Sequence, residues 1–224
     1  MFPLRDENPS LTVPVVTRAL IALNIAAFLY ELALGRELSS MFAAYSLIPL
    51  RLTLALQGNE PIFAPALTLV TSMFLHGGWM HLIGNLWYLW IFGDNVEDRL
   101  GHFTFLLFYF GSGIAAGLLH SLIAYESRLP TVGASGAIAG VLGAYAAAFP
   151  GARVVTLLPL FPFFQVVALP ALVLLGIWFA FQFLTLALGG SSAGVAWWAH
   201  IGGFAFGYAV MRIHIARGRP RGWV

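Results

Sequence analysis

The sequence predicts an all-α polytopic membrane protein, and three observations support this fold class: its composition, its long apolar runs and the placement of its arginines. Of its 224 residues, 60% are hydrophobic and only 9% are charged, and the mean hydropathy is +0.86. Soluble domains are typically about 45–50% apolar and about 25% charged, so this chain has too little charge to cover a surface in water. The composition also excludes a disordered or nucleic-acid-binding protein, and the absence of cysteine excludes a secreted disulfide scaffold.

Three membrane spans are predicted in the first half of the chain, each from an apolar run close to the roughly 20 residues that a spanning helix needs. The first covers residues 19–34, and its Asn24 and Glu31 make it the least apolar. A long connection, 37–71, follows. Its stretch 41–56 is interrupted by Pro49 and Arg51, so we expect that stretch to lie in the membrane interface or to re-enter. The second span covers 72–92 and ends at a polar turn, 93–95, and the third covers 103–124.

Three further spans are predicted in the second half. The fourth, 133–149, is short, rich in glycine and alanine, and stops at Pro150. The apolar run 154–188 is too long for one helix and contains three internal prolines. We therefore interpret 154–167 as an interfacial, partly extended connection and 168–188 as the fifth span. A small flexible loop, 189–194, leads to the sixth span, 195–215, where Trp197 and Trp198 are interpreted as interfacial belt residues.

The arginines predict the orientation of this six-helix bundle. All 11 basic residues are arginine, and four of them (Arg212, Arg217, Arg219 and Arg221) lie in the last thirteen residues. Such a cluster beside a span normally stays cytoplasmic, where it contacts anionic lipid headgroups rather than nucleic acid. With six spans, the inside segments then hold eight arginines and the outside segments three.

The predicted organisation is therefore one membrane domain with short ends. It consists of a cytoplasmic N-terminal segment, 1–18, a single six-helix domain, 19–215, and a basic cytoplasmic tail, 216–224, in the inner membrane of a cell. The N-terminal segment has acids beside its arginines and no small-residue cleavage site, so we do not expect it to be a signal peptide.

Polar side chains inside predicted spans are candidates for function, because hydrocarbon offers them no water. The candidates are His76, His81 and Asn85 in the second span, Ser135 near the start of the fourth, and His200 in the sixth. His81 and Asn85 are four residues apart and therefore share one helix face. Taken singly, each has a plainer explanation: the serine as a packing residue, a histidine as a structural or pore-lining group, and the asparagine as a link between helices.

The spacing of small residues connects Ser135 with His200. In the fourth span Gly136, Gly140, Gly143 and Ala147 form one helical stripe, and in the sixth span His200, Gly203 and Gly207 form another. Two bare stripes allow helix backbones to pack unusually close. Because Ser135 and His200 stand at the outer ends of these stripes, we expect close packing to bring the hydroxyl within hydrogen-bond distance of the imidazole.

That pairing predicts nucleophilic catalysis by a dyad. A histidine near neutral pH can take the serine proton, and attack on an amide then builds an oxyanion that needs preorganised donors. Asn85, His81 and the backbone N–H of Ser135 are the candidates for that role. No acidic residue lies in the spans near either member, which disfavours a Ser-His-Asp triad. No metal ion or organic cofactor is predicted.

Assembled in this order, the residues resemble the rhomboid family of intramembrane serine proteases, of the six-span bacterial type. The matching elements are residues 71–76, His81 with Asn85, the segment 93–101 with Glu97, the segment 133–136, and the segment 199–203. The resemblance implies Ser135 as nucleophile, His200 as base, and His81 and Asn85 at the oxyanion site. It also implies a cavity that opens outward and a long first loop in the outer leaflet.

For the reaction, the resemblance implies a substrate with a single membrane span, cut after a small residue in an unstable helix and entering beside the fifth span. Two features depart from many relatives. Position 139 is alanine instead of an aromatic residue that stacks on the histidine, so another group must orient His200. The first loop also lacks a Trp-Arg pair near Leu67. The sequence leaves the oligomeric state open.

Two other functions remain as alternatives. The first is a catalytically silent relative that binds membrane helices, which ranks lower because both serine and histidine are present. The second is a channel or transporter, which ranks last because the polar residues gather near one side of the membrane. A soluble esterase is excluded, since Ala137 breaks the Gly-x-Ser-x-Gly motif.

Overall fold

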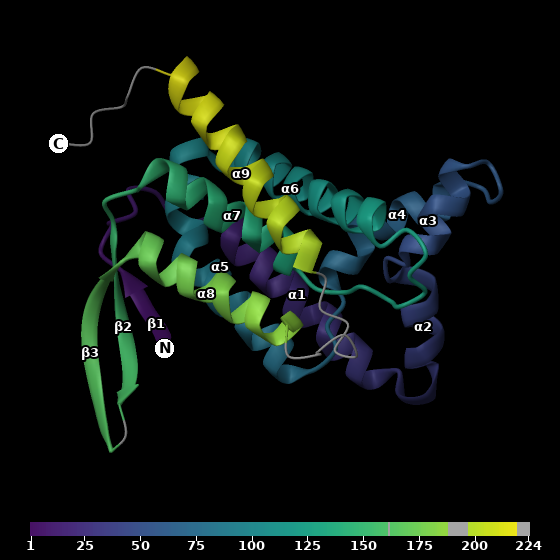
Figure 1. The fold of residues 1–224 in the computed structure, drawn as a ribbon, viewed down its shortest axis with the longest axis horizontal. Coiled ribbons are helices and arrows are strands. Elements are labelled where there is room, and N and C mark those ends of the chain that lie inside the picture. The colour runs from purple at the N-terminus through teal and green to yellow at the C-terminus, as the bar shows by residue number, and fades with distance from the viewer. Residues whose placement is uncertain (161, 188–196, 219–224) are drawn as a thin grey trace.

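Long helices packed side by side make up most of the chain, with a small antiparallel sheet at one end (Figure 1). The computed structural model describes residues 1–160, 162–187 and 197–218. Its helices are α1 (Val15–Ala33), α2 (Leu38–Tyr45), α3 (Pro49–Leu56), α4 (Phe63–Thr71), α5 (Trp79–Leu100), α6 (His102–Ile123), α7 (Ser135–Ala148), α8 (Ala171–Ala187) and α9 (Trp197–Arg217). Its strands are β1 (Phe2–Asp6), β2 (Arg153–Leu160) and β3 (Phe163–Pro170).

The short helix α7 lies at the centre, with α5, α6, α8 and α9 packed against it. Every residue from Gly136 to Ala147 is buried, which explains why this segment is built from glycine, alanine and other apolar residues. A helix without bulky side chains lets its neighbours approach on all sides. The molecule's catalytic candidate Ser135 is therefore the first residue of its most enclosed helix.

Two of the described helices, α1 and α6, are long and apolar enough to cross a membrane by themselves. A third candidate is the bent pair formed by Phe63–Phe74 and Trp79–Leu100, whose axes differ by 82°. Gly78, with φ of +149°, lies in the break between them. The predicted second span therefore begins at Trp79 and not at residue 72, because the chain turns sharply at this glycine.

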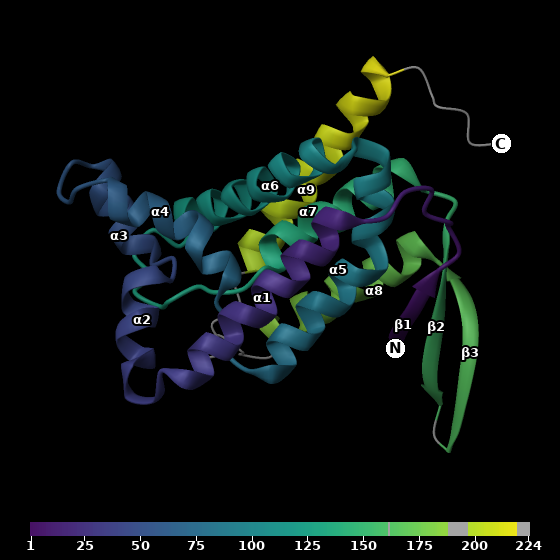
Figure 2. The ribbon, with the colours of Figure 1, turned by 180° about the vertical axis from the view of Figure 1, so that it is seen from behind.

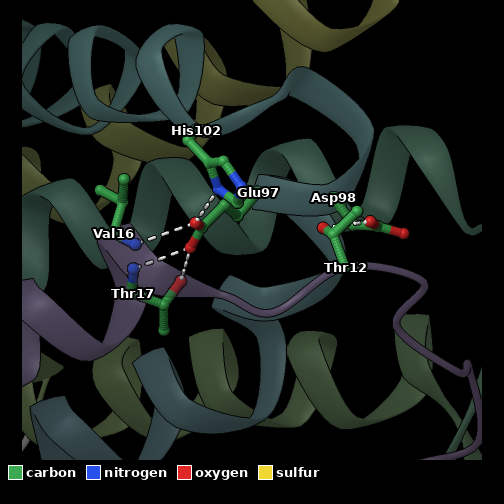
Figure 3. Close-up of polar contacts among 6 residues, drawn as sticks. All are labelled: Thr12, Val16, Thr17, Glu97, Asp98 and His102. Carbon is green, nitrogen blue, oxygen red and sulfur yellow. Dashed lines mark hydrogen bonds and ion pairs between the residues drawn. The ribbon is translucent and has the colours of Figure 1, made fainter.

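The predicted polar turn at 93–95 is wrong, since α5 continues to Leu100. The polar residues in the last turns of α5 bind the N-terminal part of the chain instead of ending the helix, as Glu97 and Asp98 show (Figure 3). The buried Glu97 carboxylate accepts hydrogen bonds from the N–H of Val16 at 2.9 Å and from the N–H and hydroxyl of Thr17, both at 2.7 Å. These N–H groups begin α1, where no intrahelical acceptor exists. Glu97 thus caps a neighbouring helix.

Two more carboxylates of α5 hold the chain that leads into α1. Asp98 accepts the hydroxyl of Thr12 at 2.6 Å and the N–H of Leu11 at 3.1 Å. Asp94 accepts the hydroxyl of Ser10. The end of α5 is therefore polar because it faces another chain segment, which a local reading of the sequence does not reveal.

A three-stranded sheet corrects the all-α prediction. Its order is β1-β2-β3 and both pairings are antiparallel. The predicted extended connection at 154–167 corresponds to the hairpin β2–β3, in which Val154 lies opposite Leu169. β1 was not predicted: Phe2 lies opposite Leu157, and the indole N–H of Trp87 donates to the carbonyl of Pro3 at 2.6 Å.

The first connection folds into the short helices α2, α3 and α4, so the stretch 41–56 does not form one continuous span. Both views place these helices at the opposite end of the molecule from the sheet (Figures 1 and 2). Leu47 and Thr131 exchange two backbone hydrogen bonds, of 3.0 and 2.8 Å, which tie this connection to the segment before α7. The predicted loop 189–194 lies outside the described residues.

Candidate functional site

The Oγ atom of Ser135 and the Nε2 atom of His200 lie 2.7 Å apart, a hydrogen-bond distance. Ser135 is the first residue of α7, and His200 lies in the first turn of α9 with only 7% of its surface exposed. Gly133 forms the turn that leads into α7. Its φ is +117°, which favours glycine, and its N–H donates to the carbonyl of Ser72 at 2.8 Å.

Glycines explain why the two helices meet so closely. A Cβ added at Gly140 would lie 3.3 Å from the carbonyl oxygen of Gly203. A Cβ at Gly203 or Gly207 would collide with the carbonyl oxygen of Gly136 or Gly140 respectively. The structure thus places all four predicted packing glycines at the contact between α7 and α9. Larger residues there would separate the helices and, with them, Ser135 and His200.

His81 and Asn85, from one face of α5, lie over the turn that precedes the serine. A Cβ added at Gly133 would stand 2.7 Å from Cε1 of His81 and 3.4 Å from Nδ2 of Asn85. Asn85 is 8% exposed, and its Nδ2 is a buried donor without a hydrogen-bond partner among the described residues. A donor held out of water beside a nucleophile is suited to bind developing negative charge.

His76 packs against His81 and is itself bound by Glu31. The N–H of His76 donates to the carboxylate of Glu31 at 3.1 Å, and the His76 ring meets the His81 ring edge to face, with centroids 5.2 Å apart. Glu31 is buried in α1. This contact gives a structural reason for the acidic residue that makes the first predicted span the least apolar.

The four candidate residues line one cavity of about 650 Å³. Its walls come from α5, α6, α7, α8, α9, the first connection and residues 130–133, and they include apolar residues such as Leu47, Leu69 and Met80. Binding sites of a few hundred Å³ with mostly apolar walls and a few convergent polar groups are typical for ligands. Among the described residues no group of three His, Cys, Asp or Glu side chains is placed to hold a metal ion.

Two tryptophans contact the ring of His200, and no local sequence pattern assigns this role to either of them. Trp178 of α8 lies with its ring centroid 5.5 Å from that of His200 and its plane inclined by 45°. Trp197 of α9 approaches to 6.2 Å at 86°. The interpretation of Trp197 as a belt residue missed this contact. Only the alanine at position 139 indicated that some other group must hold the imidazole.

Comparison with known proteins gives a family match over most of the site. A family model described as "Rhomboid domain" matches residues 65–217. The chain is 42% identical over 72 residues to Rhomboid-like protein 11, chloroplastic, of Arabidopsis thaliana, covering 32% of this chain and 25% of that protein. It is 33% identical over 150 residues to Rhomboid protein 1, mitochondrial, of Saccharomyces cerevisiae, covering 63% and 40%.

A third relative is Presenilin-associated rhomboid-like protein A, mitochondrial, of Danio rerio, which is 35% identical over 148 residues, or 63% of this chain and 36% of that protein. The matched region therefore spans less than half the length of each of these relatives.

Proposed function

The chain belongs to the rhomboid family, and from this membership and the geometry of its site we propose that it is an intramembrane serine endopeptidase. Its substrates would be membrane proteins with a single span, cut within or near that span. One observation carries the proposal: the 2.7 Å contact between Ser135 Oγ and His200 Nε2 inside a cavity. This contact supplies both nucleophile and base.

We propose that α1 and α5 to α9 are six membrane spans, with both termini cytoplasmic in the inner membrane of a cell. The sheet and the C-terminal end of α9 lie away from the first connection in both views (Figures 1 and 2), which fits the arginine distribution. α7 has 14 residues, so it rises about 21 Å, less than the roughly 30 Å of a hydrocarbon core. Ser135 then lies below the outer surface, in a cavity open to the outer side.

The first chemical step transfers a proton from the Ser135 hydroxyl to Nε2 of His200. The hydroxyl oxygen attacks the carbonyl carbon of the scissile peptide bond, and the carbonyl π electrons move to oxygen. His200 is buried and held between two tryptophan rings. A ring fixed in this way keeps its nitrogen on the hydroxyl, which removes part of the entropic cost of reaching the transition state.

The oxyanion of the tetrahedral intermediate needs donors that already point toward it. We propose as donors the Nδ2 group of Asn85, the imidazole of His81 and the N–H of Ser135 at the start of α7, since all three residues line the cavity. An N–H in the first turn of a helix has no intrahelical acceptor and lies at the positive end of the helix dipole. One such donor is typically worth a factor of about 10²–10³ in kcat.

The intermediate collapses when His200 returns its proton to the leaving amine, which breaks the C–N bond and leaves an acyl ester on Ser135. A water molecule then attacks the ester carbonyl while His200 takes a proton from it. The acyl C–Oγ bond breaks, His200 returns the proton to Ser135 Oγ, and the product leaves with a new carboxyl group. Both halves use the same imidazole, so a dyad suffices for the proton transfers.

The test is covalent labelling of the detergent-solubilised protein with a fluorophosphonate probe. We expect Ser135→Ala to abolish both labelling and the cleavage of single-span substrates, with products mapped by mass spectrometry. Ser121→Ala, which replaces a buried serine of α6 that does not line the cavity, serves as the matched control and retains both. Labelling that survives Ser135→Ala refutes the assignment. Substrate binding without turnover identifies a silent helix-binding relative instead.

A further inference from the structure

The hairpin formed by β2 and β3 is unusually apolar for an exposed structure. Residues 154–170 include no charged side chain, and only Thr156 and Gln165 are polar. Phe163 and Phe164 are each 71% exposed, and Val166 is 61% exposed. Both views show strands β2 and β3 as an arm that leaves the bundle where α7 ends and α8 begins, with the far ends of the two strands apart from every helix (Figures 1 and 2).

Charge and apolar surface are separated along the sheet. At its base Arg5 lies opposite Val155, and Asp6 lies opposite Val154. The N–H of Glu7 donates to the carbonyl of Arg153 at 3.0 Å. Glu7 and Arg153 therefore bring the number of charged residues at the base to four. Toward the tip, Phe2 lies opposite Leu157 and is 60% exposed. The base therefore suits water and headgroups, and the tip suits an apolar medium.

The tip is apolar on both faces, which discriminates between possible partners. Successive residues of a strand point to opposite faces, so the equally exposed Phe163 and Phe164 project in opposite directions. A protein partner docking on a sheet would cover one face and leave the other in water. Acyl chains, by contrast, surround an inserted segment on both sides.

We propose that the tip of the β2–β3 hairpin inserts into the bilayer leaflet beside the start of α8, with Arg5 and Arg153 at the level of the lipid phosphates. The exposed apolar surface continues onto α8, where Leu172 and Val173 are each 48% exposed. The outer edge of β3 limits the depth, because unpaired backbone groups are costly in hydrocarbon. The insertion is therefore shallow, on the order of 5–10 Å as for interfacial helices.

Fluorescence quenching tests this insertion and does not depend on proteolysis. Because the chain contains no cysteine, Phe163→Cys and Phe164→Cys each create a single labelling site for an environment-sensitive fluorophore. The full-length protein is reconstituted into vesicles of phosphatidylcholine and phosphatidylglycerol. Glu7→Cys, at an exposed residue of the base, provides the water-facing reference. Leu107→Cys, at a residue 57% exposed on α6, provides the lipid-facing one.

We expect both tip labels to be quenched by spin-labelled lipid and to show a severalfold lower iodide quenching constant than the Glu7 label. Iodide quenching of both at the Glu7 level overturns the proposal. Protection of only one tip label from iodide also overturns the proposal and indicates a protein partner on that face. A disulfide between the unlabelled cysteines of two copies overturns it as well and identifies a second copy as the partner. If a variant loses its helical circular dichroism, a substitution on the same face replaces it: Gln165→Cys for Phe163→Cys, and Val166→Cys for Phe164→Cys.

Discussion

Trp178 and His200 come from neighbouring helices, and their rings lie 5.5 Å apart at 45°. In this chain the position four residues after Ser135 is the buried Ala139, which offers no ring to the histidine. Trp178 fills the place of such a group from α8, and Trp197 approaches from a second direction. The ring of the proposed base is thus contacted from α8, a helix that carries neither member of the proposed dyad, as well as from its own helix α9.

Replacing Trp178 is expected to lower turnover more than substrate binding. Aromatic ring pairs contribute about 0.5–1.5 kcal/mol, so Trp178→Ala should reduce kcat by about 2- to 10-fold, while Trp178→Phe restores most of it. Steady-state kinetics with a fluorogenic single-span substrate measures both constants. Trp198→Ala, at a tryptophan that is 41% exposed, is the control and leaves kcat unchanged. A higher KM at constant kcat would mean that Trp178 only forms the cavity wall.

The close contact of α7 and α9 predicts opposite outcomes for two glycine substitutions. Gly207→Ala places a methyl group against the carbonyl oxygen of Gly140 and should destabilise the protein by about 1–3 kcal/mol. Gly176→Ala in α8 meets nothing within 4 Å and should be neutral or stabilising by up to about 1 kcal/mol. Thermal unfolding in detergent compares the two. Equal melting temperatures would contradict the packing role of the glycine stripe.

Two adjacent carboxylates of α5 should differ strongly in their contribution to stability. Glu97→Ala leaves the buried N–H groups that begin α1 without their acceptor, at a cost of about 1–3 kcal/mol. Asp98→Ala removes exposed hydrogen bonds and should cost less than about 0.5 kcal/mol. The comparison uses denaturation midpoints of the two variants and of the unmodified chain. A milder effect for Glu97→Ala than for Asp98→Ala would exclude the capping role.

The attachment of the N-terminal strand should weaken as the pH rises. Burial raises the pKa of Asp6 from 3.8 to about 6, although the hydrogen bond from the Tyr145 hydroxyl partly opposes this. The folded state therefore favours the protonated carboxyl. Its stabilisation is fully present below pH 3.8 and is lost as the pH rises through about 6.

Melting temperatures of Asp6→Asn should consequently show a flatter pH dependence in this window than those of the unmodified chain. Glu7→Gln, which neutralises the exposed neighbour, keeps the original dependence. The role of Asp6 is contradicted when Asp6→Asn and the unmodified chain lose stability in parallel.

Local patterns were sufficient to predict the long helices. Apolar runs near 20 residues indicate helices that satisfy their own backbone hydrogen bonds, whatever lies beside them. The glycine spacing also brought Ser135 and His200 into one hypothesis, because a helical stripe repeats within a few turns of one segment. The match to the rhomboid family confirms the resemblance that these residues carry.

Features that depend on distant partners were decided only by the tertiary structure. β1 forms because residues near the N-terminus pair with β2, about 150 positions away. α5 continues past Gly93 because Glu97 binds the first turn of α1 and Asp98 binds the segment that precedes it. Trp178 reaches His200 only when α8 and α9 both pack against α7. A helix is specified by hydrogen bonds within one segment, whereas strand pairing, capping from a neighbour and ring contacts each need a second segment whose position the local sequence does not encode.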